Sequence, residues 1–81
     1  MIVEDEVVVS ADIKAKLEKM GHHVPQIVRY GEKVLETAID VAPDLILMDI
    51  KLKGNLDGIE AAGNVKEHLD IPIVFLTSFT D

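Results

Sequence analysis

The chain has 81 residues, with 8 Lys and Arg against 15 Asp and Glu, which gives a formal net charge of −7. A chain of this size forms at most one small domain, and folding hides only about 60% of its unfolded surface. The negative charge has the wrong sign for a nucleic-acid surface, because such surfaces neutralise phosphates with cations. The absence of cysteine excludes a disulfide scaffold and a Cys-ligated zinc or iron–sulfur site. Apolar runs fall far short of the roughly 20 residues of a membrane span and no signal peptide is evident, so we expect a cytoplasmic protein.

The first third of the chain predicts a strand, a helix and a second strand. Residues 1–3 are a short apolar run that ends at an acidic segment, residues 4–6. Apolar residues then recur at spacings of three and four, as on one face of a helix that ends at Gly21. These residues are Val9, Ile13, Leu17 and Met20. Residues 22–28 are a weaker strand candidate, in which Pro25 favours an edge position.

The middle of the chain predicts a second helix and a third strand. The helix ends at Pro43, and its apolar positions are Val34, Leu35, Ala38, Val41 and Ala42. Residues 45–48 are continuously apolar between Asp44 and Asp49, which is typical of a strand covered on both faces.

A third helix and a fourth strand complete the pattern. Asp57 is a good N-cap, and Glu60 three residues later gives a capping-box pattern. We expect the inner face of this helix to consist of Ile59, Ala62, Gly63, Lys66 and Leu69. Residues 71–76 predict another buried strand.

The element order β-α-β-α-β-α-β predicts an α/β fold with a parallel sheet in three layers, within one domain over residues 1–81. We expect nothing after residues 71–76 to cover that strand. An uncovered strand invites pairing with a second copy or an exchange of elements, so a homodimer is one expectation.

Polar side chains stand at the ends of three predicted strands. In open parallel sheets, ligands bind beyond the carboxyl ends of the strands. If the first and third strands are neighbours, Glu4, Asp5 and Asp49 converge on one pocket, and Thr77 with Ser78 adds hydroxyls from the fourth strand. Three close carboxylates cannot all stay ionised without a counter-charge, and a hard cation, Mg²⁺ or Mn²⁺, supplies one.

Each of these features alone has an ordinary explanation. An acidic run after a strand is most often a solvated loop, and Asp49 could be a turn residue at a strand end. We interpret Lys51 and Lys53 as part of a solvated loop. The histidines lack metal-ligand spacing, and we interpret them as surface residues. The histidines are His22, His23 and His68. The combination of acid, acid and hydroxyl on three strand ends favours the functional interpretation.

Four segments resemble the receiver domain of two-component response regulators: IVEDE, PDLILMDIKL, LDGIEAA and IPIVFLTS. The resemblance covers all 81 residues. It implies a doubly wound, flavodoxin-like sheet of strand order 2-1-3-4-5. Here we expect the order 2-1-3-4, in a receiver domain incomplete at its C-terminus, because the family's fifth strand and last two helices would follow Asp81.

The resemblance also implies a phosphoryl transfer from the phosphohistidine of a histidine kinase, with Mg²⁺ required. Asp49 matches the phosphoacceptor, and Asp5 resembles the metal-binding acid, with Glu4 beside it. Lys51 would lend its backbone carbonyl to the metal. Thr77 matches the hydroxyl residue that bonds the phosphoryl group.

One family feature has no counterpart. Ser78 matches a small residue that borders phosphoryl access, but the lysine at the end of the family's fifth strand has no match. We therefore keep three functions in view. The first is a phosphoacceptor domain that is not a turnover enzyme, and the second is a truncated receiver that serves only for dimerisation or docking. A metal-dependent phosphohydrolase ranks lowest, because no second catalytic acid is placed to protonate a leaving group.

Overall fold

The structure is a computed structural model that describes residues 1–52 and 54–76. Within these residues, four strands form one parallel sheet in the order β2-β1-β3-β4. The strands are β1 (Ile2–Val3), β2 (Ile27–Val28), β3 (Ile46–Asp49) and β4 (Ile73–Leu76). The helices are α1 (Val7–Lys19), α2 (Val34–Val41) and α3 (Gly58–His68), with a short 3-10 helix, η1 (Gly31–Lys33), before α2. The predicted α/β fold and strand order are confirmed.

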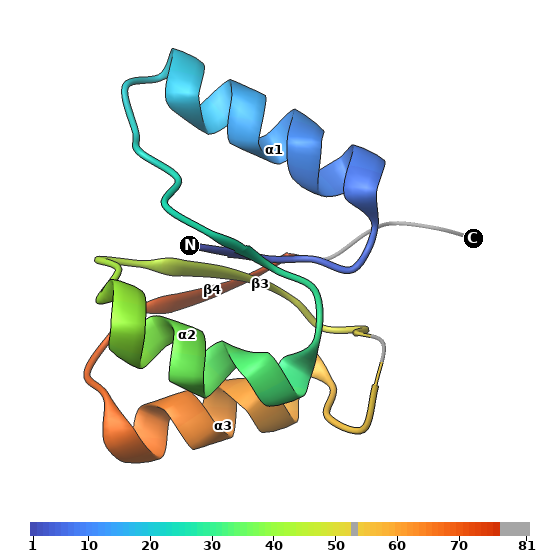
Figure 1. The fold of residues 1–81 in the computed structure, drawn as a ribbon, viewed down its shortest axis with the longest axis vertical. Helices are drawn as coiled ribbons and strands as arrows, with labels where there is room; N and C mark the ends of the chain where they lie inside the picture. The colour runs from blue at the N-terminus through green and yellow to red at the C-terminus, as the bar shows by residue number, and fades with distance from the viewer. Residues whose placement is uncertain (53, 77–81) are drawn as a thin grey trace.

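The sheet separates two layers of helix. Figure 1 shows α1 on one side of the sheet and α2 with α3 on the other. Successive side chains of a strand point to opposite faces, so Ile46 and Met48 face α2 and α3, and both are fully buried there. The core on that side also takes in buried residues of the helices and of the neighbouring strands, among them Val3, Val28, Val34, Ala38, Ala61 and Val65.

The α1 side of the sheet is less covered than we expected. The strand of residues 45–48 was predicted to be buried on both faces, but Leu47 is half-buried and Leu45 is exposed. In the described chain α1 lies alone on this face, opposite two helices on the other (Figure 1). The continuous apolar run therefore overstated the burial.

The fourth strand differs from its prediction in the same way. β4 starts at Ile73 and lies at one edge of the described sheet, paired with β3 only. Val74 is 47% exposed and Phe75 is 41% exposed, so the expected burial was wrong for these two residues, whereas Ile71 is buried. The opposite edge is β2, so the predicted edge position is confirmed, but the strand is shorter than the predicted residues 22–28 and Pro25 lies before it.

The predicted inner faces of two helices were partly wrong. In α1, Ile13 and Leu17 are half-buried, but Met20 is 71% exposed and the buried residue is Ser10. In α3 the predicted Ile59, Gly63 and Lys66 are exposed, and the buried residues are Gly58, Ala61, Ala62 and Val65. Both stripes of α3 have helical spacing. The structure uses the stripe with the smaller side chains, which let the helix approach the sheet closely.

The helix ends follow their sequence signals. Asp57 accepts a hydrogen bond from the Glu60 amide at 2.8 Å, and its own amide donates to the Glu60 carboxylate at 3.2 Å. This completes the predicted capping box. Helix α2 ends before Pro43, with Ala42 in the left-handed conformation at φ 50. None of the described helices has the length and apolar character needed to cross a membrane.

Candidate functional site

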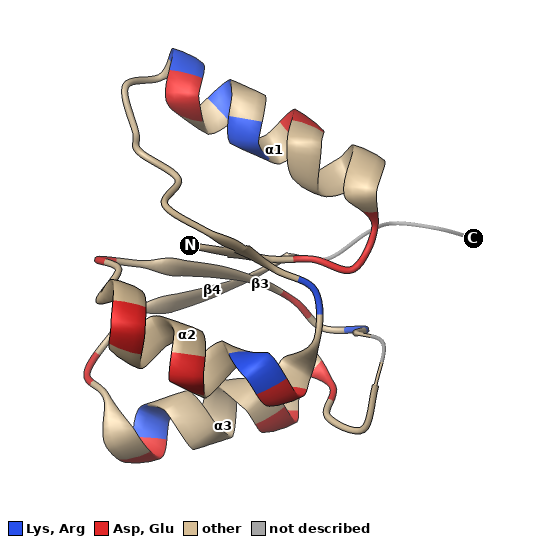
Figure 2. Cartoon of the chain, in the orientation of Figure 1, with Lys and Arg blue, Asp and Glu red and all other residues tan. Residues whose placement is uncertain are grey.

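The carboxyl ends of β1 and β3 bring three acidic side chains together. The two strands are parallel neighbours, and Val3 lies opposite Met48 in their register. The residues that follow, Glu4 with Asp5 and Asp49, therefore leave the sheet side by side. One carboxylate oxygen of each lies within 4.8 Å of the others. Figure 2 shows acidic segments in the loop from β1 into α1 and at the end of β3.

Glu4 is the buried member of this acidic cluster, which we define as Glu4, Asp5 and Asp49. Its side chain is 6% exposed. The pKa of the Glu4 carboxyl is raised from 4.5 to about 7, chiefly by burial and in part by the neighbouring carboxyls of Asp5 and Asp49, while a hydrogen bond from the Glu6 amide opposes the shift. That amide donates to Glu4 Oε2 at 3.1 Å. Near neutral pH the site thus holds a proton where a metal ion could supply the positive charge.

Asp49 is placed for chemistry with a partner from solution. It is the last residue of β3 and is half-buried. The Lys51 amide donates to Asp49 Oδ1 across 3.4 Å, at the long limit for such a bond. The Lys51 side chain is exposed, as predicted for a lysine of a surface loop.

Gly58 fixes the backbone behind Asp49, and the sequence interpretation did not identify this role. The Gly58 amide donates to the Ile50 carbonyl at 2.7 Å. A Cβ atom at position 58 would collide with the Asp49 carbonyl oxygen and would approach Ile50 Cα within 2.8 Å. Only glycine allows α3 to begin this close to the end of β3. The Asp-Gly pair at positions 57 and 58, just before an apolar helical pattern, was the available signal.

Arg29 and Ser10 are further residues that the sequence interpretation missed. Arg29 Nη1 donates to the Glu4 carbonyl at 3.3 Å and to Ser10 Oγ at 3.2 Å. Ser10 Oγ in turn donates to the Val7 carbonyl at 2.9 Å. The sequence signals were the sole arginine of the chain and a serine within an apolar helical run.

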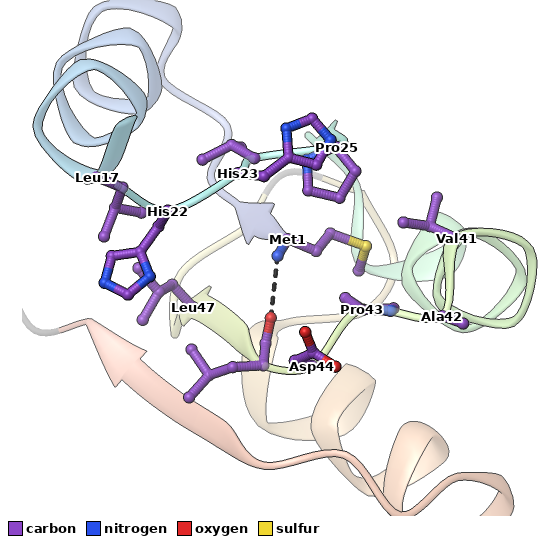
Figure 3. A pocket seen from close by; sticks show the side chains of 12 residues that line it. Met1, Leu17, His22, His23, Pro25, Val41, Ala42, Pro43, Asp44 and Leu47 are labelled. Atoms are coloured by element: carbon purple, nitrogen blue, oxygen red, sulfur yellow. Dashed lines mark hydrogen bonds between the residues drawn. The ribbon is translucent and has the colours of Figure 1, made fainter. Parts of the chain in front are cut away.

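Several predicted residues lie elsewhere or cannot be placed. Thr77 and Ser78 fall outside the described residues, and so does Lys53. The histidines are exposed as predicted: His22, His23 and His68. His22 and His23 border a cavity of about 810 Å³ at the opposite end of the sheet, where the Met1 amino group donates to the Leu45 carbonyl at 2.9 Å (Figure 3). None of the acidic cluster lines this cavity.

The donor set of the acidic cluster fits a hard divalent cation. Carboxylate oxygens are the ligands that Mg²⁺ and Mn²⁺ favour. Three of them lie within 4.8 Å of one another. The pKa of Glu4 is raised chiefly by burial and in part by the neighbouring carboxyls, and a bound cation would offset the repulsion between these carboxyls without requiring protonation.

Comparison with known proteins identifies a family that matches this geometry. The family described as response regulator receiver domain matches residues 1–81. The transcriptional regulatory protein PdtaR of Mycobacterium tuberculosis is 34% identical over 80 residues, which cover 99% of this chain and 38% of PdtaR. The phyllosphere-induced regulator PhyR of Methylorubrum extorquens is 29% identical over 82 residues, which cover 100% of this chain and 31% of PhyR. The chain spans about a third of the length of these relatives.

Solved structures agree with the sequence relatives. The receiver domain of a modulated diguanylate cyclase from Desulfovibrio desulfuricans G20 superposes with a TM-score of 0.91 at 39% identity, over 99% of this chain and 64% of that one. The BeF3-activated receiver domain of Klebsiella pneumoniae RstA gives a TM-score of 0.88 at 34% identity, over 99% of this chain and 67% of that one. With the parallel sheet and its acidic edge, these matches establish that the chain belongs to the response regulator receiver domain family.

Proposed function

We propose that this receiver domain accepts a phosphoryl group onto Asp49 from the phosphohistidine of a histidine kinase, with Mg²⁺ or Mn²⁺ at the acidic cluster. The observation that carries the proposal is the convergence of Glu4, Asp5 and Asp49 within 4.8 Å at the end of β3. The metal ligands would be the carboxylates of Asp5 and Asp49 and the backbone carbonyl of Lys51, with Glu4 beside them.

The proposed reaction needs little more than positioning and charge compensation. An Asp49 carboxylate oxygen forms a bond to phosphorus, and the bond from phosphorus to the donor imidazole nitrogen breaks. The nitrogen keeps the electron pair and takes up a proton, and the product is an aspartyl phosphate. The bound cation would neutralise the charges of the carboxylate and the phosphoryl oxygens. Asp49 is half-buried, so its carboxylate is partly accessible from solution.

The acceptor is consumed one for one, so we propose a phosphoprotein that signals and not a turnover enzyme. Thr77 would bond the phosphoryl group, and Ser78 would border its access. We propose that this phosphotransfer takes place in the cytoplasm.

Intact-protein mass spectrometry tests the proposal. We expect a single phosphoryl adduct after incubation with acetyl phosphate and Mg²⁺, and no adduct in Asp49→Asn or in EDTA. Asp44→Asn is the matched control, because Asp44 is an exposed aspartate just before the other end of β3 and should leave the adduct unchanged. An unchanged adduct in Asp49→Asn would refute the assignment of the acceptor.

A second candidate function, docking without phosphotransfer, is favoured by two observations. PhyR of Bartonella quintana, which is 36% identical with a TM-score of 0.88, was crystallised in complex with the anti-sigma factor NepR. In this chain the edge strand β4 exposes Val74 and Phe75, which could pair with a second copy. Self-association that is independent of Mg²⁺ and unaffected by Asp49→Asn would favour this candidate. A monomer at high concentration in analytical ultracentrifugation would count against the homodimer.

A further inference from the structure

Arg29 forms hydrogen bonds to the β1–α1 turn, which carries Glu4 and Asp5. Arg29 follows β2, and its Nη1 atom donates to the Glu4 carbonyl at 3.3 Å and to Ser10 Oγ at 3.2 Å. A guanidinium Nη atom carries two hydrogens, so one nitrogen can serve both acceptors. The acceptors stand before and after Asp5 in the sequence. A single group therefore holds both ends of the segment that carries Asp5.

Besides the bonds from the Glu6 amide to Glu4 Oε2 and from the Glu4 amide to the Val28 carbonyl, this turn has few other anchors. The N-cap of α1, Glu6, makes no side-chain capping bond, and the first turn of the helix contains no acidic residue. Apolar packing adds little there, since Val7 is 63% exposed and Val8 is 81% exposed. By contrast Ser10 is fully buried, and its hydroxyl links Arg29 to the Val7 carbonyl. The polar link through Ser10 thus joins the start of α1 to the end of β2.

The guanidinium acts on the turn through neutral acceptors and forms no ion pair with the cluster. Its hydrogen-bond partners are a backbone carbonyl and a hydroxyl. The ion pairs among the described residues join Lys16 to Asp12 and Lys33 to Glu36. A nearby positive charge by itself would oppose the binding of a second cation. A favourable effect of Arg29 on metal binding would consequently have to come from geometry.

We propose that Arg29 is a positioning residue, which holds the β1–α1 turn through the Glu4 carbonyl and Ser10 so that Glu4 and Asp5 face Asp49. The consequence for metal affinity rests on the proposed function. The expected effect on the order of the turn is independent of the proposed function. Supporting contacts of this kind typically change metal affinity by about 10- to 100-fold when removed.

The first experiment measures the dissociation constant of Mn²⁺ alone, by electron paramagnetic resonance, for the 81-residue chain and its variants. We expect Arg29→Gln to weaken Mn²⁺ binding about 10-fold or more, Ser10→Ala to weaken it less, and Arg29→Lys to restore part of the affinity. Lys19→Gln is the control, because it removes one charge from the exposed end of α1 and should leave binding unchanged. Unchanged or tighter binding by folded Arg29→Gln would overturn the proposal, since tighter binding is the purely electrostatic result.

The second experiment needs no metal. Amide hydrogen exchange should accelerate at Glu6 and Ser10 in Arg29→Gln, while the Leu69 amide at the end of α3 keeps its protection. Equal exchange at the turn in wild type and variant would overturn the positioning role. If Arg29→Gln does not fold, Ser10→Ala and Arg29→Lys carry the same test. If the wild type binds no Mn²⁺, the proposed metal site is wrong, and the exchange data decide the role of Arg29 separately.

Discussion

Replacing Glu4 by glutamine should change how the stability of the domain depends on pH. The pKa of the Glu4 carboxyl is raised from 4.5 to about 7, chiefly by burial. Between these values the folded state holds a proton that the unfolded state has lost, so the free energy of unfolding falls as pH rises. Below pH 4.5 Glu4 does not lower the free energy of unfolding, and above pH 7 the decrease has reached its full size. The difference between the two pKa values corresponds to a decrease of about 3 kcal/mol in the free energy of unfolding.

Glutamine keeps the size and the acceptor oxygen of Glu4 but cannot ionise. Without metal, Glu4→Gln should therefore match the wild type near pH 4.5 and exceed its stability at pH 8 by up to about 3 kcal/mol. Mg²⁺ at pH 8 should stabilise the wild type, because it binds the ionised cluster of the folded state. Mg²⁺ should stabilise Glu4→Gln less, because glutamine cannot ionise. The difference in the free energy of unfolding between the two proteins should thus shrink or reverse its sign when metal is added.

Urea unfolding followed by circular dichroism, from pH 4.5 to 8 in EDTA and then in Mg²⁺, measures these differences. Glu6→Gln is the matched control, since Glu6 is an exposed acid in the same loop and its loss changes the net charge equally. The reasoning would be refuted if Glu4→Gln kept the pH dependence of the wild type. It would also fail if Glu6→Gln removed as much of that dependence.

Four further variants test the packing around the site and in the sheet. Gly58→Ala should destabilise the fold by about 1–3 kcal/mol in urea unfolding and should slow phosphorylation by acetyl phosphate, because its Cβ atom would collide with the Asp49 carbonyl. Stability and phosphorylation equal to those of the wild type would contradict the close approach of α3 to the end of β3. Asp57→Ala should cost about 1 kcal/mol of unfolding free energy through the lost N-cap, and no loss would mean that the capping box contributes nothing. Ile46→Ala in the core should cost about 2–5 kcal/mol, whereas Val74→Ala on exposed β4 should cost about 0.5 or less; equal losses would contradict the assigned faces of the sheet.

The acidic cluster and the strand order could be predicted because they depend on local sequence and on general rules for parallel sheets. Asp49 ends an apolar run, Asp5 follows another, and neighbouring parallel strands deliver their ends to one edge. The capping box at Asp57 was equally local. These features need no knowledge of which side chains meet across the fold.

The features that were missed depend on contacts between distant segments. The bond from Arg29 to Ser10 spans 19 positions, and nothing near either residue signals the other. The inner face of α3 was misjudged because Ile59 is more apolar than Ala61, yet Ala61 is buried and Ile59 is exposed. The exposure of Val74 follows from the edge position of β4, which the apolar pattern alone does not encode.

Mapping the phosphorylated residue tests the central claim most directly. The chain would be incubated with acetyl phosphate and Mg²⁺, reduced with borohydride to convert an aspartyl phosphate into homoserine, and sequenced by peptide mass spectrometry. We predict homoserine at position 49 and at no other aspartate, with none formed in EDTA. Homoserine at Asp5 instead, or an unmodified Asp49 in a folded chain with Mg²⁺ present, would contradict the account.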